Sequence, residues 1–274
     1  MSEPAVDPAP FRVDPGAAVT LADRDPRHTG DFDGAKDDGK AAHDVLGRRL
    51  RDLQELLYAD GRHKLLVVLQ SMDTGGKDGT IRHVFRKVDP IGVHMWGFKK
   101  PSSAELARDY LWRVHPHVPG DGELVVFNRS HYEDVLVTRV HGQVDDDRAR
   151  RRFGHIRDFE RLLAEEGTTI VKVFLHISRD EQRERLQARL DEPTKRWKFS
   201  SADVDERAHW DSYQRVYEEA ITETTSEHAP WYVVPADRKW YRNLVVSTIL
   251  VDTLEALGME YPPAEEDLDS IVID

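Results

Sequence analysis

Short apolar runs alternate with longer amphipathic stretches along most of the chain. The apolar runs predict strands at Leu65–Gln70, Val93–Phe98, Glu123–Phe127, Thr169–Ile177 and Trp231–Pro235. Runs such as LLVVL, LVVF and IVKVFL are too apolar for a sheet with one solvent face, so helices must cover both faces. The alternation predicts a doubly wound α/β fold around a mostly parallel, five-stranded sheet.

Spacing and capping residues mark the helices between these runs. One amphipathic helix carries leucines at steps of four, three and four, followed by Gly61, which is placed to end it; the leucines are Leu46, Leu50, Leu53 and Leu57. This helix packs either inside the domain or between subunits. Ser102–Glu105 and Ser178–Glu181 each predict a capping box at a helix start.

The two ends of the chain differ from the middle. Residues 1–36 are rich in Pro, Asp, Gly and Ala and predict an irregular arm, either disordered or lying over the domain surface. Residues 37–262 carry the periodic pattern of one domain. Residues 263–274 form an acidic tail, which we expect to be a loosely held terminus.

Composition excludes several classes of protein. No apolar run approaches the length of a bilayer span and no signal-peptide pattern opens the chain, so we expect a cytoplasmic protein without a membrane partner. The absence of cysteine excludes disulfides, thiolate chemistry and cysteine-based metal sites. A net charge of −12 argues against binding nucleic acid through the whole surface. Any anionic ligand must therefore meet a local basic cluster.

The segment MDTGGKDGT follows the first strand and resembles a phosphate-binding loop, GxxxxGK[ST], with two departures. Ser71 replaces the first glycine and Asp78 replaces the Ser/Thr that normally ligates magnesium. The lysine and the remaining glycines favour a phosphate site over a plain strand-to-helix turn. Asp73 adds a carboxylate that could hold Mg²⁺. The alternative is that Asp73 only stabilises the helix dipole.

The third strand run ends at Asn128, where a phosphate-loop kinase normally has a metal-holding aspartate. An amide brings no charge, so metal binding would depend more on Asp73, with Glu133 as a further candidate ligand. Arg129 follows at once, and its guanidinium can grip a phosphate with two parallel hydrogen bonds.

A basic segment lies further along the chain. Arg185 and Arg189 share one face of a helix that Pro193 ends, although interleaved acids also fit a solvated, salt-bridged helix. Lys195, Arg196 and Lys198 then surround a tryptophan, which is typical of a lid over phosphates.

A possible base-binding platform follows the second strand. Trp96 and Phe98 lie two residues apart and could form a platform on which the base of an acceptor nucleotide stacks. Core packing is an equal alternative for both rings. Lys99 and Lys100 come next and could meet the phosphates of the acceptor.

Four motifs in order, MDTGGKDGT, GFKKPS, FNRSHYEDVLVTRVH and DEPTKRWKFSSADVDERAHWDSY, resemble the family-2 polyphosphate kinases, most closely class III, over roughly residues 40–260. The resemblance implies a three-layer αβα phosphate-loop kinase fold like that of thymidylate kinase, with a helical lid at about residues 179–203. It also implies magnesium-dependent phosphoryl transfer from inorganic polyphosphate to AMP and ADP. Asn128 agrees with class III, and Asp203 is expected to begin the final helix of the lid motif.

The resemblance assigns the reaction centre to Asp73, Lys77 and Arg129. The expected phosphate-binding residues are Gly75, Gly76, Lys77, Asp78, Gly79, Thr80, Arg129, Arg185, Arg189, Lys195 and Lys198. The residues expected near the acceptor nucleotide are Trp96, Phe98, Lys99, Lys100, Asn128 and Glu133. We also expect a homo-oligomer. Two alternatives are an ATP-dependent nucleoside monophosphate kinase and a non-catalytic nucleotide or polyphosphate sensor.

Overall fold

A parallel sheet forms the centre of the protein in a computed structural model that describes residues 6–30, 32–264 and 273. Its five strands are β1 (Lys64–Ser71), β2 (Val93–Gly97), β3 (Leu124–Asn128), β4 (Thr168–His176) and β5 (Trp231–Pro235). They lie in the order β2-β3-β1-β4-β5, with every neighbouring pair parallel. All five strand predictions are confirmed to within one residue at each end.

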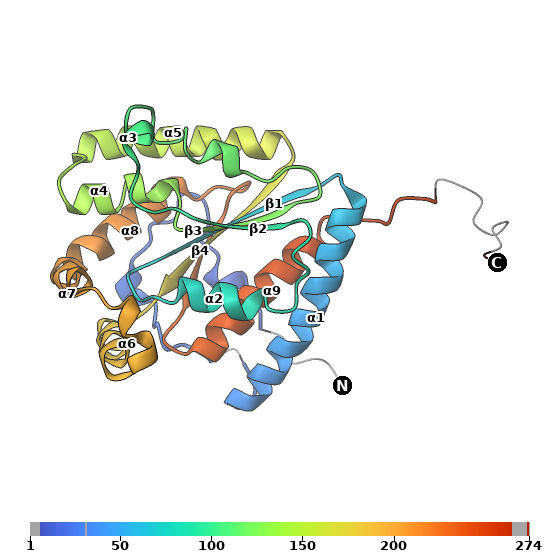
Figure 1. Cartoon of the computed structure of the whole chain (residues 1–274), viewed down its shortest axis with the longest axis horizontal. Coiled ribbons are helices and arrows are strands. Elements are labelled where there is room, and N and C mark those ends of the chain that lie inside the picture. The colour runs from blue at the N-terminus through green and yellow to red at the C-terminus, as the bar shows by residue number, and fades with distance from the viewer. Residues whose placement is uncertain (1–5, 31, 265–272, 274) are drawn as a thin grey trace.

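Helices cover both faces of the sheet, which gives the three-layer αβα arrangement (Figure 1). One face carries α1 (Lys36–Asp60), α2 (Lys77–Val84) and α9 (Lys239–Glu255). The other carries α3 (Ser103–Leu106), α4 (Val137–Val140), α5 (Asp146–Glu165) and α8 (Trp210–Thr224). Helices α6 (Arg179–Asp191) and α7 (Ser201–Glu206) lie at one end of the sheet. Short 3₁₀ helices are η1 (Ala9–Phe11), η2 (Leu21–Asp23), η3 (His115–His117), η4 (His131–Asp134), η5 (Pro193–Lys198) and η6 (Arg207–His209).

The leucine-spaced helix is α1, and it packs inside the domain. Leu50, Leu53 and Leu57 are buried in the main core, and α1 runs against α9. Gly61 ends α1 in the left-handed conformation, at φ 65°, and its N–H donates to Leu57 O. The leucine pattern therefore marks a core contact in this subunit.

One predicted capping box is confirmed and the other is half formed. Ser102 Oγ accepts from Glu105 N, and the Glu105 carboxylate accepts from Ser102 N. Ser178 Oγ accepts from Glu181 N, but the Glu181 side chain turns to Arg185 instead. The N–H of Ser178 then donates to Asp237 Oδ1, 2.8 Å away, because the arginine competes for the glutamate.

The described part of the N-terminal segment lies on the domain beside β5. Phe11, Val13 and Leu21 are buried in the main core. Val13 N donates to Trp231 O, and Arg12 forms an antiparallel bridge with Tyr232. Of the acidic tail predicted at 263–274, residues 265–272 and 274 lie outside the described residues. No helix in the described ranges is long and apolar enough to cross a bilayer.

The one cation within the apolar pattern of β4 is Lys172, which is fully buried. Its Nζ donates to Glu160 Oε2 at 2.5 Å, to Thr224 O at 2.7 Å and to Tyr132 Oη at 3.0 Å. Three acceptors satisfy the three N–H groups of the ammonium. The contacts of Lys172 with Glu160 and Tyr132 therefore connect β4 to α5 and to η4, the 3₁₀ helix that follows β3 in the chain.

Candidate functional site

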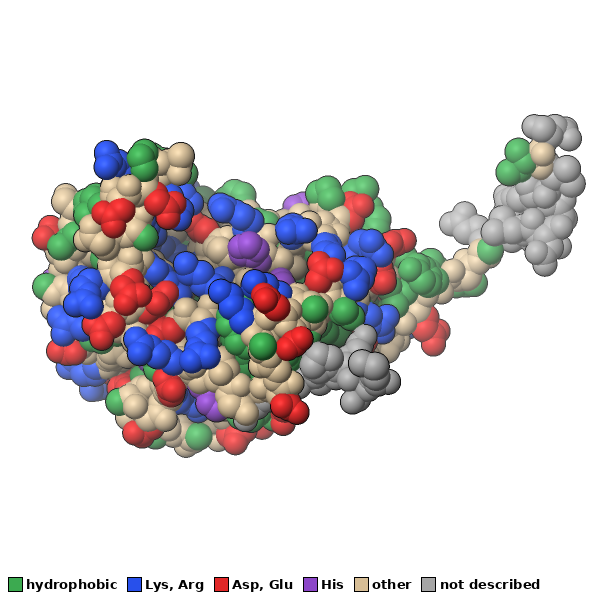
Figure 2. Space-filling model, turned by 90° about the horizontal axis from the view of Figure 1, so that it is seen from below, with side chains coloured by type: hydrophobic (Ala, Val, Ile, Leu, Met, Phe, Trp, Pro, Cys, Tyr) green, Lys and Arg blue, Asp and Glu red, His purple; other side chains and the backbone are tan. Residues whose placement is uncertain are grey.

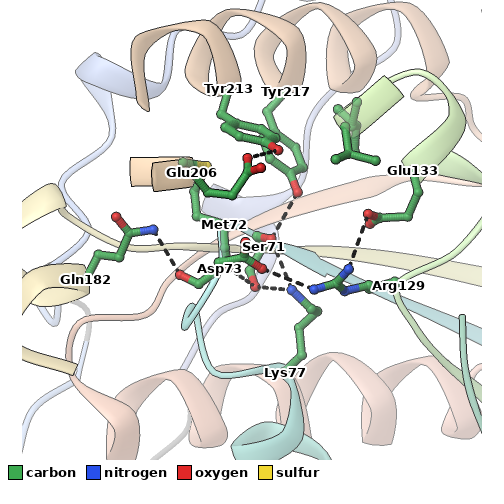
Figure 3. A pocket seen from close by; sticks show the side chains of 12 residues that line it. Ser71, Met72, Asp73, Lys77, Arg129, Glu133, Gln182, Glu206, Tyr213 and Tyr217 are labelled. Carbon is green, nitrogen blue, oxygen red and sulfur yellow. Dashed lines mark hydrogen bonds and ion pairs between the residues drawn. The ribbon is translucent and has the colours of Figure 1, made fainter. Parts of the chain in front are cut away.

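The loop between β1 and α2 is shaped by the unusual Ser71. Lys77 Nζ donates to Ser71 Oγ at 2.9 Å and to Ser71 O at 3.1 Å, so the lysine folds back over the loop (Figure 3). A side chain at position 75 would stand 2.4 Å from the Cβ of Ser71, so Gly75 must remain glycine. Gly76 has φ 106°, and Thr74 also has a positive φ of 61°. The loop keeps the tight form of a phosphate loop despite its altered sequence.

Asp73 and Arg129 meet across the mouth of this loop. Arg129 Nη2 lies 3.1 Å from Asp73 Oδ1, and its Nη1 lies 3.8 Å from Glu133 Oε2 (Figure 3). Arg129 follows β3 with a positive φ of 66°, which turns its side chain back toward the loop. The three residues predicted as the reaction centre, Asp73, Lys77 and Arg129, therefore line one small pocket of about 40 Å³.

The two departures from the ordinary kinase pattern meet in space. Asn128 Nδ2 donates to Asp78 Oδ1 at 2.7 Å. An ordinary phosphate loop has a hydroxyl on the loop and a carboxylate on this strand. Here the carboxylate is on the loop and the amide is on the strand.

Burial first, and then the neighbouring Arg129, depress the pKa of Lys77 to about 8. A nearby anion would restore the charged form, since opposite charge favours it. A phosphate group bound beside Lys77 would therefore stabilise its charged ammonium form.

Arg242 of α9 is a site residue that the sequence did not reveal. Its side chain is only 2% exposed, and Nη1 would lie 2.2 Å from a Cβ on Gly76. Nε and Nη2 both donate to Asn243 Oδ1, and no carboxylate in the described part of the chain forms an ion pair with it. Burial first, and then Arg185, lower the pKa of Arg242 to about 9. The only sequence signal was an arginine inside an apolar helix.

A cleft of about 1260 Å³ opens beside the loop, between α2, α6, η5 and the start of α9. Eleven Lys or Arg side chains line it, against five Asp or Glu side chains. Figure 2 looks at the face that carries α2 and α9 and shows Lys and Arg side chains gathered around a hollow. The negatively charged chain therefore does contain a local basic cluster.

Most of the expected site residues line this cleft. They are Asp73, Gly75, Gly76, Lys77, Asp78, Gly79, Phe98, Lys99, Lys100, Asn128, Arg129, Arg185, Arg189, Lys195 and Lys198. Glu133 lines the adjoining small pocket. Thr80 lies outside both, since it is buried in α2, where its hydroxyl donates to Gly76 O.

The proposed aromatic platform is not present in this structure. Phe98 is 5% exposed and packs edge-on against Phe127, with ring centroids 5.0 Å apart. Trp96 is 44% exposed, stacks on His117 and does not line the cleft. Both rings contact His117, at centroid distances of 3.5 Å for Trp96 and 6.1 Å for Phe98, so they do lie on one side, as the spacing of two predicts. Phe98 packs mainly in the core, the alternative given for it, and it also lines the cleft.

In the basic helix α6, the side chain of Arg185 forms its hydrogen bonds with other parts of the protein. The side chain of Arg185 donates to Glu181 Oε1 and to four backbone carbonyls, those of Thr74, Gly75, Ala236 and Asp237. These bonds occupy all five of its N–H groups. The expectation that Arg185 binds phosphate gives way to a role in bracing the loop.

The rest of the lid segment is tied more loosely. Arg189 Nη1 lies 2.9 Å from Asp203 Oδ2, which joins α6 to α7. Asp203 lies inside the short helix α7 and does not begin a long helix. Lys195 pairs with Glu192, and Trp197 is 78% exposed under Lys198.

The acidic side chains of the site limit how a metal could be held. No group of three or more His, Cys, Asp or Glu side chains among the described residues is placed to bind a metal ion. Asp73 and Asp78 flank Lys77, and each offers a carboxylate on the cleft. This donor set suits an ion that completes its shell with phosphate oxygens and water.

Comparisons with known proteins agree with this site. A family model described as Polyphosphate kinase 2 (PPK2) matches residues 33–262. The chain is 59% identical to an AMP/ADP-polyphosphate phosphotransferase of Meiothermus ruber, with 96% of this chain and 99% of that protein aligned. It is 45% identical to an ADP-polyphosphate phosphotransferase of Rhodopseudomonas palustris, over 92% and 91% of the two chains.

A solved structure supports the fold directly. Polyphosphate kinase 2 from Arthrobacter aurescens TC1 superposes with a TM-score of 0.93 at 46% identity, covering 97% of this chain and 96% of that one. The mostly parallel sheet, the phosphate loop and the sequence relationship all lead to the same assignment. The chain belongs to the polyphosphate kinase 2 family.

Proposed function

We propose that the protein transfers the terminal phosphoryl group of inorganic polyphosphate to AMP and ADP, giving ADP and ATP. The observation that carries this proposal is the cleft, in which eleven cations face five carboxylates beside a phosphate loop. Donor and acceptor are both polyanions, so holding them together requires such an excess of positive charge. The relative from Meiothermus ruber, named for both AMP and ADP, supports the two acceptors.

The donor chain is placed by the loop and by α9. Lys77 and the backbone N–H groups of Gly75 and Gly76 would bind its terminal phosphate. Arg242 lies against Gly76 in this loop and lines the same cleft. Because Arg242 is buried without an ionic partner among the described residues, a phosphate chain would supply its missing counter-charge.

The acceptor approaches from the side of β3. A terminal phosphate oxygen of AMP or ADP attacks the last phosphorus of the donor chain, and the P–O bond to the next phosphate breaks. The shortened polyphosphate leaves with the bonding electron pair. Arg129 orients the phosphates, and the acceptor oxygen is already anionic at neutral pH, so no strong base is needed.

Magnesium is the metal that we propose for this reaction. Asp73 would hold it, with Asp78 close by on the cleft. When bound, the ion neutralises negative charge on the phosphate oxygens. Asp73 also fixes Arg129 through their 3.1 Å contact, so it organises the site in two ways.

The decisive experiment supplies purified protein with AMP, polyphosphate and magnesium, without ATP. Formation of ADP and ATP supports the proposal. Transfer from ATP to AMP without any transfer from polyphosphate would favour a nucleoside monophosphate kinase. Tight binding of both substrates without turnover would favour a sensor. A cytoplasmic location and a homo-oligomer remain predictions from the sequence, as does the absence of a nucleic-acid partner.

A further inference from the structure

A second basic cavity, of about 400 Å³, lies between the segment around α3 and the first half of α5. Arg108 and Arg113 line one wall, and Arg148, Arg151 and Arg152 line the other. The large cleft beside the phosphate loop, where we propose that transfer occurs, is called the transfer cleft. None of the residues that line the second cavity also lines the transfer cleft. Its size falls within the usual range for a site that binds a small ligand.

The three carboxylates of this cavity are already committed. Glu105 caps Ser102 and lies 3.1 Å from Arg113. Asp134 lies 3.7 Å from Arg152. Asp109 accepts from two backbone N–H groups. Five arginines thus face three carboxylates, so the cavity has an excess of positive charge.

Arg108, Arg148 and Arg151 have no carboxylate partner within the described chain. The Arg108 side chain donates to Ala104 O and stacks on Trp112. The side chains of Arg148 and Arg151 form no hydrogen bond or ion pair with another described residue. All three side chains are exposed at the cavity, so an anionic ligand can reach their guanidinium groups.

Two acidic side chains near the start of α5 pair with arginines that do not line the cavity. Asp146 pairs with Arg139 at 2.7 Å and Asp147 pairs with Arg150 at 3.0 Å. Arg148 and Arg151 are three residues apart in the same helix and face one side. Like charges held together in this way repel each other, and a multivalent anion would offset that cost.

We propose that Arg108, Arg148 and Arg151 form a second anion site for a linear oligophosphate group, separate from the transfer cleft. Guanidinium forks match phosphate oxygens in pairs, and three forks around one hollow suit several linked phosphates better than one. The second cavity also adjoins the transfer cleft along the chain. Pro101 follows Lys100, which lines the cleft, and Arg113 donates to Lys99 O at 2.8 Å.

The oligophosphate could be inorganic or part of a nucleotide, and the test separates the two. Calorimetric titration of the full chain with tripolyphosphate should give two binding sites per chain. In the double variant Arg148→Gln/Arg151→Gln, one site should weaken by about 100-fold, since each charge-assisted bond contributes about tenfold. A parallel titration with ATP shows whether a nucleoside triphosphate uses the same site.

The matched control is Arg157→Gln/Arg161→Gln, because both arginines are exposed on the same helix and pair with acids outside the cavity. This control should keep both sites, and thermal melting should show that both double variants are folded. A single site in the native protein, unchanged binding by Arg148→Gln/Arg151→Gln, or an equal loss in the control would overturn the proposal. Since binding is read without turnover, failure of the proposed transfer reaction would leave this result interpretable.

Discussion

Replacing Arg242 with methionine should make the unliganded protein more stable and the polyphosphate complex weaker. Arg242 is 2% exposed and has no ionic partner in the described ranges, so its charge is poorly compensated before substrate binds. Methionine is a flexible apolar side chain that can fill much of the same space without charge. The variant therefore distinguishes the destabilisation that the buried charge causes in the unliganded protein from its contribution to polyphosphate binding.

The size of the effect follows from the pKa. Burial holds the pKa of Arg242 at about 9, well below the ordinary value of arginine, which corresponds to about 5 kcal/mol of destabilisation at roughly 1.4 kcal/mol per pH unit. That cost is fully present below pH 9 and is lost only as the pH rises from there toward the ordinary pKa of arginine, so it applies at neutral pH. Asn243 Oδ1 loses both its donors in the variant, at a cost of about 1–3 kcal/mol.

The balance is a net gain of about 2–4 kcal/mol for Arg242→Met. In a chain of this size each kcal/mol raises the melting temperature by about 2–4 °C, so the unliganded variant should melt at least about 4 °C higher. Polyphosphate should raise the melting temperature of the native protein much more than that of the variant.

The assay is thermal unfolding with and without polyphosphate, with Arg242→Lys as the matched control that keeps a positive charge. The lysine variant should remain less stable than the methionine variant and should keep part of the response to polyphosphate. If Arg242→Met melts at or below the native temperature, or if polyphosphate stabilises both proteins equally, the reasoning about an uncompensated buried charge is wrong.

Three further predictions concern the loop and the core. Asp73→Asn should abolish transfer, while circular dichroism shows an intact fold; near-normal activity would refute the role of this carboxylate. Lys77 loses its proton above pH 8, so kcat/KM for polyphosphate should fall there, whereas a flat profile up to pH 10 would contradict the lowered pKa. Lys172→Met leaves Glu160 buried without its cation and should cost about 3–5 kcal/mol in urea unfolding. The double variant Lys172→Met/Glu160→Leu should recover much of that loss, and an equal or larger loss would show that the charges themselves stabilise the core.

The sheet could be predicted well from sequence because its central strands are buried on both faces. Leu65–Leu69 and Leu124–Phe127 carry no polar residue, and such short apolar runs are typical of strands that are covered on both faces. The phosphate loop was equally accessible, since its glycines and Lys77 are contiguous in the chain.

Residues brought together by folding were harder to predict. Arg242 reaches the loop from the last helix, and nothing near it in sequence indicates that its guanidinium ends below Gly76. The arginines of α6 were recognised as a basic cluster, but whether Arg185 faces a ligand or the backbone depends on the conformation of the loop. Phe98 shares a side with Trp96, as its spacing predicts, but its burial against Phe127 depends on packing that the spacing does not reveal.

The hydrogen bond between Asn128 and Asp78 has a consequence for how such a loop can change over successive substitutions. Replacing Asp78 with serine alone would leave Asn128 without its acceptor and the end of β3 still without a carboxylate. Replacing Asn128 with aspartate alone would place two carboxylates about 2.7 Å apart, where like charges repel strongly. Both single-step routes to the ordinary kinase arrangement thus pass through an impaired intermediate. A change at either residue therefore requires a matching change at the other if the contact between loop and strand is to be kept.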